Sequence, residues 1–144
     1  MYTWSTDQVD PRDRFDYWRE GPGSGLAQHA LRTGRLSLAR RLIERYLSRP
    51  ALSPALIADM LGISVRHMHV LFEATPTSFS QTVAALRVDR SCRLLREAPD
   101  RPIAEIAFAS GFDSLATFYR AFNAVEGMSP GDYRAIQRAA SIER

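Results

Sequence analysis

A short stretch with two histidines and an arginine among large apolar residues has the clearest chemical potential in this sequence. It reads ISVRHMHVLFEA over residues 63–74, with Arg66, His67 and His69 as the polar side chains. Such a group could bind a metal ion, act in catalysis, belong to a core helix or contact DNA. On a helix, residues i and i+2 lie about 200° apart, so the two histidines cannot bind one ion together. Helical histidine pairs that bind metal use the i, i+4 spacing, and we expect no metal and no cofactor.

The rest of the sequence contains no catalytic grouping either. It shows no paired acids, no Ser-His-Asp arrangement, no phosphate-binding loop and no cluster of metal ligands. The single cysteine, Cys92, excludes an intrachain disulfide and fits a reducing cytoplasm. No apolar run approaches the roughly 18 residues of a membrane span. We therefore predict a cytoplasmic protein that is not an enzyme and does not enter a membrane.

The charge is unevenly distributed along the chain. Residues 1–24 contain three arginines and five acidic residues, a net charge of −2, whereas residues 25–144 contain sixteen arginines and eleven acidic residues, a net charge of +5. A basic body favours a polyanionic partner such as nucleic acid. A merely soluble basic domain would show the same charge, so the charge alone leaves both alternatives open.

Helical periodicity, with signals for helix starts and stops, continues from about residue 33 to the end. Apolar residues recur at spacings of three and four over residues 39–47, and Arg49-Pro50 ends that helix. Ser53-Pro54 is typical of a helix start, with a serine cap and a proline in the first turn. No segment alternates like a strand. The sequence predicts an all-α fold of about seven helices, including helices near residues 64–74, 78–97, 103–110 and 115–126.

The helix pairs on either side of the long helix at 78–97 repeat one pattern. Ala58 is followed by Gly62 and a serine, and Ala107 is followed by Gly111 and a serine one residue later. A small alanine lets two helices cross closely, the glycine permits a tight turn and the serine caps the second helix. This is the pattern of a helix-turn-helix unit. The long helix is apolar on two sides, so we predict two helix-turn-helix subdomains joined by this central helix.

The run from Leu52 to Tyr133 resembles the DNA-binding domain of the AraC/XylS family of bacterial transcription regulators. The segments that match the family read IADMLGISVRHMHVLF, SFSQTVAALRVDRSCRLL and IAEIAFASGFDSLATFYRAFNAVEGMSPGDYR. The resemblance implies a homeodomain-like fold whose two recognition helices, at about 64–74 and 114–126, enter successive major grooves. Such grooves recur about 34 Å apart on one face of DNA.

A second, weaker resemblance concerns the N-terminus. STDQVDPRDRFDYWRE is similar to the opening of the sensor domain in a subset of the family. We expect residues 1–25 to be a remnant of that domain with a flexible linker, 26–50 a linker helix region, 51–138 the double helix-turn-helix domain and 139–144 a tail. Because the rest of a sensor domain is missing, we expect a monomer without a small-molecule effector, which sedimentation at micromolar concentration would test.

Residues near the start of each recognition helix face the bases in this motif. In the first helix these are Arg66, His69 and Val70. Arg66 can pair with guanine O6 and N7, whereas Val70, where the family usually has a polar residue, offers only apolar contact. In the second helix they are Ala116, Thr117 and Arg120. Because an alanine offers no polar group to a base, that helix is expected to position the domain more than to read sequence. The candidate phosphate contacts are Ser64, His67, Thr77, Ser78, Ser114 and Tyr119.

These observations favour a sequence-specific DNA-binding regulator of transcription. As is common in the family, we expect it to be an activator that contacts RNA polymerase near a promoter. For His67 a structural role, such as capping, is an alternative to DNA contact. The alternative for the whole chain is a truncated relative that competes for sites, or serves as a protein-interaction module, without activating transcription.

Overall fold

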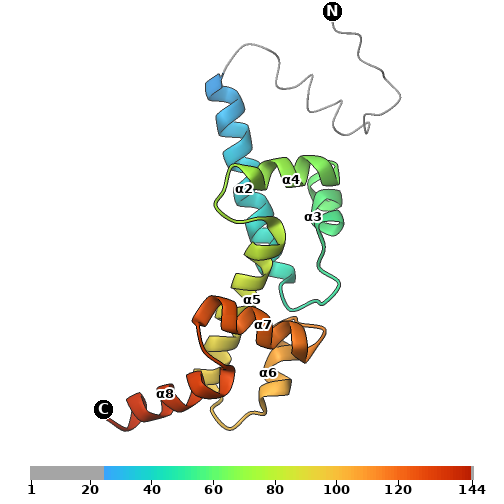
Figure 1. Cartoon of the computed structure of the whole chain (residues 1–144). Coiled ribbons are helices and arrows are strands. Elements are labelled where there is room, and N and C mark those ends of the chain that lie inside the picture. Colours follow the sequence, from blue (N-terminus) through green and yellow to red (C-terminus); the bar gives the residue numbers. More distant parts are fainter. Residues whose placement is uncertain (1–24, 144) are drawn as a thin grey trace, which may run out of the picture. The chain divides into compact units, whose positions relative to one another are not determined.

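The computed structural model describes residues 25–143, so the expected sensor-domain remnant lies almost wholly outside the described residues. Within these residues the chain forms helices and no strand, as predicted for an all-α protein (Figure 1). The seven helices are α2 (Gly25–Tyr46), α3 (Pro54–Leu61), α4 (Val65–Glu73), α5 (Phe79–Glu97), α6 (Ile103–Ala109), α7 (Leu115–Glu126) and α8 (Pro130–Ile142).

Two compact units make up the described chain. The first contains the residues up to Leu42 together with Ser53–Phe79, and thus the pair α3–α4. The second contains Ile43–Leu52 and the residues from Ser80 onward, and thus the pair α6–α7 with α8. We call them unit 1 and unit 2. Helix α2 contributes its last turn to unit 2, whereas its earlier turns belong to unit 1.

Serine caps fix where four of the helices begin. The Ser53 hydroxyl accepts a hydrogen bond from the N–H of Leu56 at 3.2 Å, and Pro54 occupies the first turn of α3. The serines before α4, α7 and α8 accept in the same way from the residue three positions later. Each cap satisfies one of the N–H groups that a helix start leaves without an intrahelical partner. These local signals explain why the predicted starts of α3, α4 and α7 are confirmed.

The start of α2 differs from the sequence-based expectation. The periodicity predicts a helix from about residue 33, but α2 begins at Gly25 and runs for 22 residues. Its first three turns are mostly exposed and lack an apolar stripe of the kind that marks residues 39–47. A helix can extend beyond its amphipathic part because propagation adds one hydrogen bond for each residue fixed. The amphipathic pattern therefore identified only the buried part of the helix.

The two helix-turn-helix units share one turn geometry. In unit 1 Gly62 has a φ of 69°, and the N–H of Ile63 donates to the carbonyl of Ala58 at 3.0 Å. In unit 2 Gly111 has a φ of 104°, and the N–H of the next residue donates to the carbonyl of Ala107 at 3.2 Å. These are the left-handed ends at which glycine is favoured. The extra residue of the second turn is Asp113, which lies between this turn and the capping serine.

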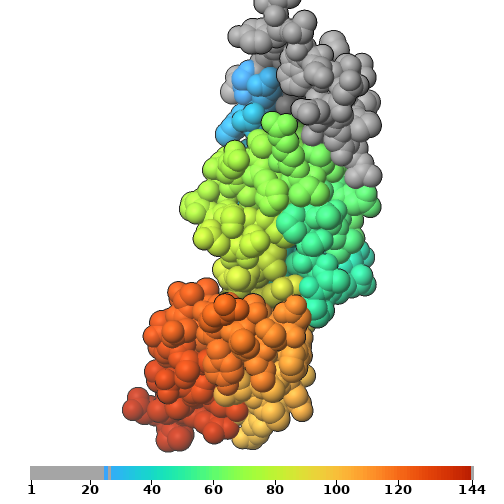
Figure 2. All heavy atoms as spheres, turned by 45° about the vertical axis from the view of Figure 1, so that its right-hand side comes forward, coloured from blue at the N-terminus to red at the C-terminus, as the bar shows by residue number. Residues whose placement is uncertain are grey.

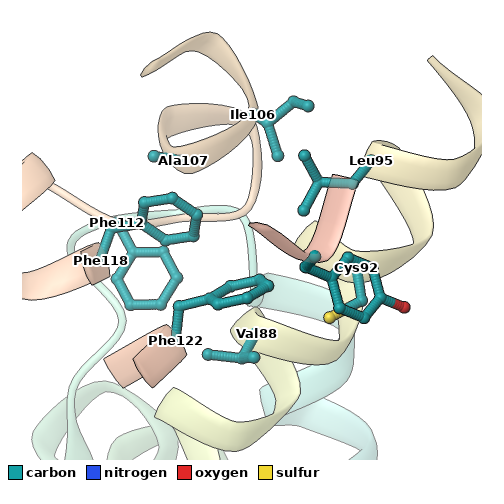
Figure 3. Close-up of a cluster of buried hydrophobic side chains, with 9 residues drawn as sticks. Val88, Cys92, Leu95, Ile106, Ala107, Phe112, Phe118 and Phe122 are labelled. Atoms are coloured by element: carbon teal, nitrogen blue, oxygen red, sulfur yellow. The ribbon is translucent and has the colours of Figure 1, made fainter. Parts of the chain in front are cut away.

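The long helix α5 is buried on two sides, as its sequence predicts. Phe79 and Val83 are buried in one row, and Val88, Cys92 and Leu95 are buried in the other. The second row forms the core of unit 2 with Ile106 and Ala107 of α6 and with three phenylalanines (Figure 3). The rings of Phe112 and Phe122 lie 5.2 Å and 5.6 Å from that of Phe118, centroid to centroid. This aromatic cluster fixes the buried side of α7.

Candidate nucleic-acid interface

Helix α4 has one buried side and one exposed side. Met68, Leu71 and Phe72 are at most 3% exposed, as expected for the core side of the helix. Arg66 and His69 are exposed, and Val70 retains 41% of its surface. The three residues therefore lie on the solvent side, where a ligand of unit 1 could reach them. His67 is half-buried between the two sides, and its backbone N–H donates to the Ser64 hydroxyl at 3.0 Å.

Helix α7 presents a matching exposed side in unit 2. Phe118 and Phe122 are fully buried, whereas Ala116, Thr117 and Arg120 are exposed. Figure 2 shows the orange segment that contains α7 at the surface of unit 2 on the face turned to the viewer. The remaining exposed side chains of the first two turns are Leu115, which is 38% exposed, and Tyr119, which is 43% exposed.

The two capping serines have a structural task. Ser64 is only 7% exposed, and its hydroxyl oxygen accepts from the N–H of His67. Ser114 accepts from the N–H of Thr117 at 3.2 Å and donates to the Thr117 side-chain oxygen at 2.8 Å. The sequence suggested both serines as phosphate contacts. The structure places their hydroxyls in the caps, where they orient the first turns of the two exposed helices.

The loop between α4 and α5 brings two further candidates to the surface. Thr77 and Ser78 are exposed and immediately precede the first residue of α5. Thr75 stabilises this loop, because its hydroxyl lies 2.8 Å from the carbonyl oxygen of Phe72 and 2.6 Å from that of Thr77. Thr77 and Ser78 therefore lie on a braced loop at the start of α5, and helix N-termini attract anions.

Arg87 makes a long-range contact that sequence reasoning missed. Another arginine of α5, Arg93, forms an ion pair with Asp89 at 3.6 Å. Arg87 donates to the carbonyls of Leu47 at 3.1 Å and Arg49 at 2.8 Å. Burial lowers the pKa of the Arg87 guanidinium. These carbonyls lie 40 and 38 residues away in sequence, so no local pattern could indicate the contact.

Cys92 is a core residue, as its position in the apolar row predicts. It is 4% exposed, and burial raises the pKa of its thiol to about 11. A thiol with that pKa stays protonated near neutral pH, and the thiolate is the form that acts as a nucleophile or metal ligand. The neighbouring Tyr133 hydroxyl lies 2.6 Å from a guanidinium nitrogen of Arg96, which donates to it. This group therefore belongs to the fold and not to a reactive site.

Residues 25–143 contain neither a cluster of metal ligands nor a single helix that could span a membrane. No three His, Cys, Asp or Glu side chains in this range are grouped so that they could hold a metal ion. No single helix there is long and apolar enough to cross a membrane; by length and composition alone, α3 and α4 together would be, but they meet at a bend of 99°.

Comparison with known proteins places the two helix pairs in a family. A family model described as a helix-turn-helix domain matches residues 57–136, more than half of the chain. The HTH-type transcriptional regulator GlxA of Rhizobium meliloti is 40% identical over 93 residues, which cover 64% of this chain and 27% of that protein. The transcriptional activator NphR of a Rhodococcus species is 32% identical over 103 residues, which cover 72% of this chain and 30% of that protein.

Solved structures show the same similarity. The C-terminal domain of AraT, a response regulator from Geobacillus stearothermophilus, is 27% identical with a TM-score of 0.67, and the match covers 71% of this chain and 84% of that one. An AraC-type transcriptional regulator from Chromobacterium violaceum is 28% identical with a TM-score of 0.65, over 75% and 96% of the two chains. The chain spans about a third or less of the length of the curated relatives that it matches. The chain belongs to the AraC/XylS family of DNA-binding transcriptional regulators.

Proposed function

We propose that this protein binds DNA sequence-specifically by inserting α4 and α7 into successive major grooves. One observation carries the proposal: both helix-turn-helix units bury one side of their second helix and expose the other. The exposed sides carry Arg66 and His69 on α4 and Arg120 on α7. An α-helix fits the major groove of B-DNA, and arginine paired with guanine is the commonest specific contact there. The two exposed helices thus provide two points at which sequence can be read.

The phosphate backbone is the second part of the proposed interface. His67, Thr77, Ser78 and Tyr119 are the side chains that we assign to it. Ser64 and Ser114 contribute through the helix starts that they cap, because backbone N–H groups and helix N-termini are common phosphate partners. The net charge of +5 over residues 25–144 favours binding to a polyanion. Affinity that depends on phosphate contacts falls as salt rises.

Arg66→Ala and Arg120→Ala are expected to weaken binding and to relax specificity, each in one part of the site. Loss of a good arginine–guanine pair costs about 1–3 kcal/mol, which is about 5-fold to 150-fold in affinity. The operator duplex, meaning the sequence that the protein enriches from random DNA, should show this loss in fluorescence anisotropy. The loss of affinity for a mixed-sequence duplex should be much smaller.

Arg93→Ala is the matched control for these two variants. Arg93 is also an exposed helical arginine, but its guanidinium lies 3.6 Å from the carboxylate of Asp89. Its replacement should leave the ratio of operator to mixed-sequence affinity unchanged. The proposal fails if all three variants lower both affinities equally, because that result would indicate charge without readout.

The regulatory output belongs to the same proposal. NphR is named a transcriptional activator, and we propose that this chain also activates transcription by contacting RNA polymerase. Transcription in vitro from a promoter that carries the operator upstream tests this step. An increase in transcript that Arg66→Ala and Arg120→Ala both abolish is the expected result. Binding without any increase would favour the alternative of a competitor that occupies sites without activating.

A further inference from the structure

The exposed sides of α4 and α7 carry related residues in reversed order. Ser64 and Ser114 cap the two helices, so positions 50 residues apart correspond. One turn of helix separates Arg66 from Val70 in α4, and the same turn separates Ala116 from Arg120 in α7. All four side chains are exposed. At these two positions each helix therefore presents one arginine and one aliphatic side chain, with the arginine first in α4 and second in α7.

Neither helix offers polar readout at its aliphatic position. Val70 is 41% exposed and has no hydrogen-bonding group. One turn after it, α4 carries the exposed carboxylate of Glu73, which phosphates would repel. Beside Ala116, Leu115 is 38% exposed, and the Thr117 hydroxyl oxygen is already engaged by Ser114 at 2.8 Å. The side chains at positions 70 and 116 themselves therefore offer a base only methyl groups.

The major groove contains one partner that suits a methyl group. Thymine carries a C5 methyl at the groove edge, and apolar contact from alanine or a similar side chain distinguishes it from the other bases. We propose that Val70 and Ala116 each read a thymine methyl, while Arg66 and Arg120 each read a guanine. The order of the two base types along the recognition helix is then opposite in the two halves of the site. This inference rests on the proposed function, because it requires α4 and α7 to face bases.

Uracil substitution tests the methyl contact directly. Deoxyuridine pairs like thymidine and keeps the O4 acceptor, but it lacks the methyl group. We expect one thymine in each half of the operator whose replacement by uracil weakens binding of the wild-type protein about threefold to fourfold, the value of one buried methylene-sized group. Arg66→Ala and Arg120→Ala assign the halves, because each blurs the half that its own helix reads.

Protein variants identify the side chain that meets each methyl. Val70→Ser, which places a hydroxymethyl group where the valine methyls stood, should remove the uracil effect in the α4 half and leave it intact in the α7 half. Ala116→Ser, which replaces the methyl group by a hydroxymethyl group, should do the reverse. Each protein variant, combined with uracil at one thymine, forms a thermodynamic cycle. If the two binding losses are non-additive for only one helix and one base, that side chain and that base are in contact.

The methyl readout and the proposed function would fail with different experimental results. An operator with two halves whose thymines all tolerate uracil within experimental error would overturn the methyl readout and leave the proposed function in place. A uracil effect that Val70→Ser and Ala116→Ser leave unchanged would overturn it as well. Binding that enriches no motif from random DNA would overturn the proposed function and, with it, this inference.

Discussion

Gly111→Ala is expected to destabilise unit 2 more than any other single methyl addition at its turns. A Cβ at this position would meet the carbonyl oxygen of Leu47 at 2.1 Å and the Nε of Arg87 at 2.7 Å. The oxygen is part of the backbone and cannot rotate away. It also accepts the Arg87 hydrogen bond, so displacing it would break the contact that attaches residues 47–49 to α5.

The expected loss for Gly111→Ala is about 2–6 kcal/mol in the free energy of unfolding. Of this, about 1–3 kcal/mol comes from a non-glycine residue at the φ of 104°, and a similar amount comes from overpacking. Urea unfolding followed by circular dichroism measures it. Gly127→Ala is the control within unit 2: its φ is 69°, but nothing lies within 4 Å of the added Cβ. It should lose only about 1–2 kcal/mol; equal losses would refute the proposed role of the close contact.

Phe118→Ala is expected to remove about 3–5 kcal/mol from the stability of unit 2. The side chain is fully buried, and its ring lies within 5.6 Å of the rings of Phe112, Tyr119 and Phe122, centroid to centroid. Figure 3 shows Phe112, Phe118 and Phe122 packed together. Truncation would leave a cavity that the surrounding rings fill only in part. Because this ring anchors the buried side of α7, operator binding should fall together with thermal stability.

Val125→Ala is the matched control for Phe118→Ala. Val125 lies on the same helix and is 48% exposed. An exposed substitution of this kind changes stability by about 0.5 kcal/mol or less. The two variants should therefore differ clearly in the temperature at which they unfold. A loss below about 1 kcal/mol for Phe118→Ala would mean that α7 is not held by the aromatic cluster.

Local signals in the sequence were sufficient for most of the helix boundaries. Helix α7 begins after its serine cap and ends before Gly127, as predicted, because both ends are set by residues within one turn of them. The alanine, glycine and serine that both helix pairs share in sequence likewise correspond to matching turn hydrogen bonds in the structure. The early start of α2 was missed, because an exposed helix has no apolar stripe to reveal it.

The sequence predicted which side of each recognition helix is exposed. It did not predict the contacts between residues that are distant in sequence. Spacing alone separated the exposed Arg66 and Arg120 from the buried Met68 and Phe118, because a helix repeats every 3.6 residues. It could not show that Arg87 reaches back to the carbonyl of Leu47, since that contact depends on how distant segments pack. The capping role of Ser64, in contrast, was predictable from its place after the turn, and its hydroxyl accepts from the N–H of His67 as expected.

Selection of bound sites from random duplex DNA tests the central claim most directly. We predict that the wild-type protein enriches an asymmetric motif with two halves about one helical turn, 10–10.5 base pairs, apart. Arg66→Ala should blur one half, and Arg120→Ala should blur the other. Enrichment of a single half that both variants blur, or strong binding without any motif, would contradict the claim that α4 and α7 each read bases.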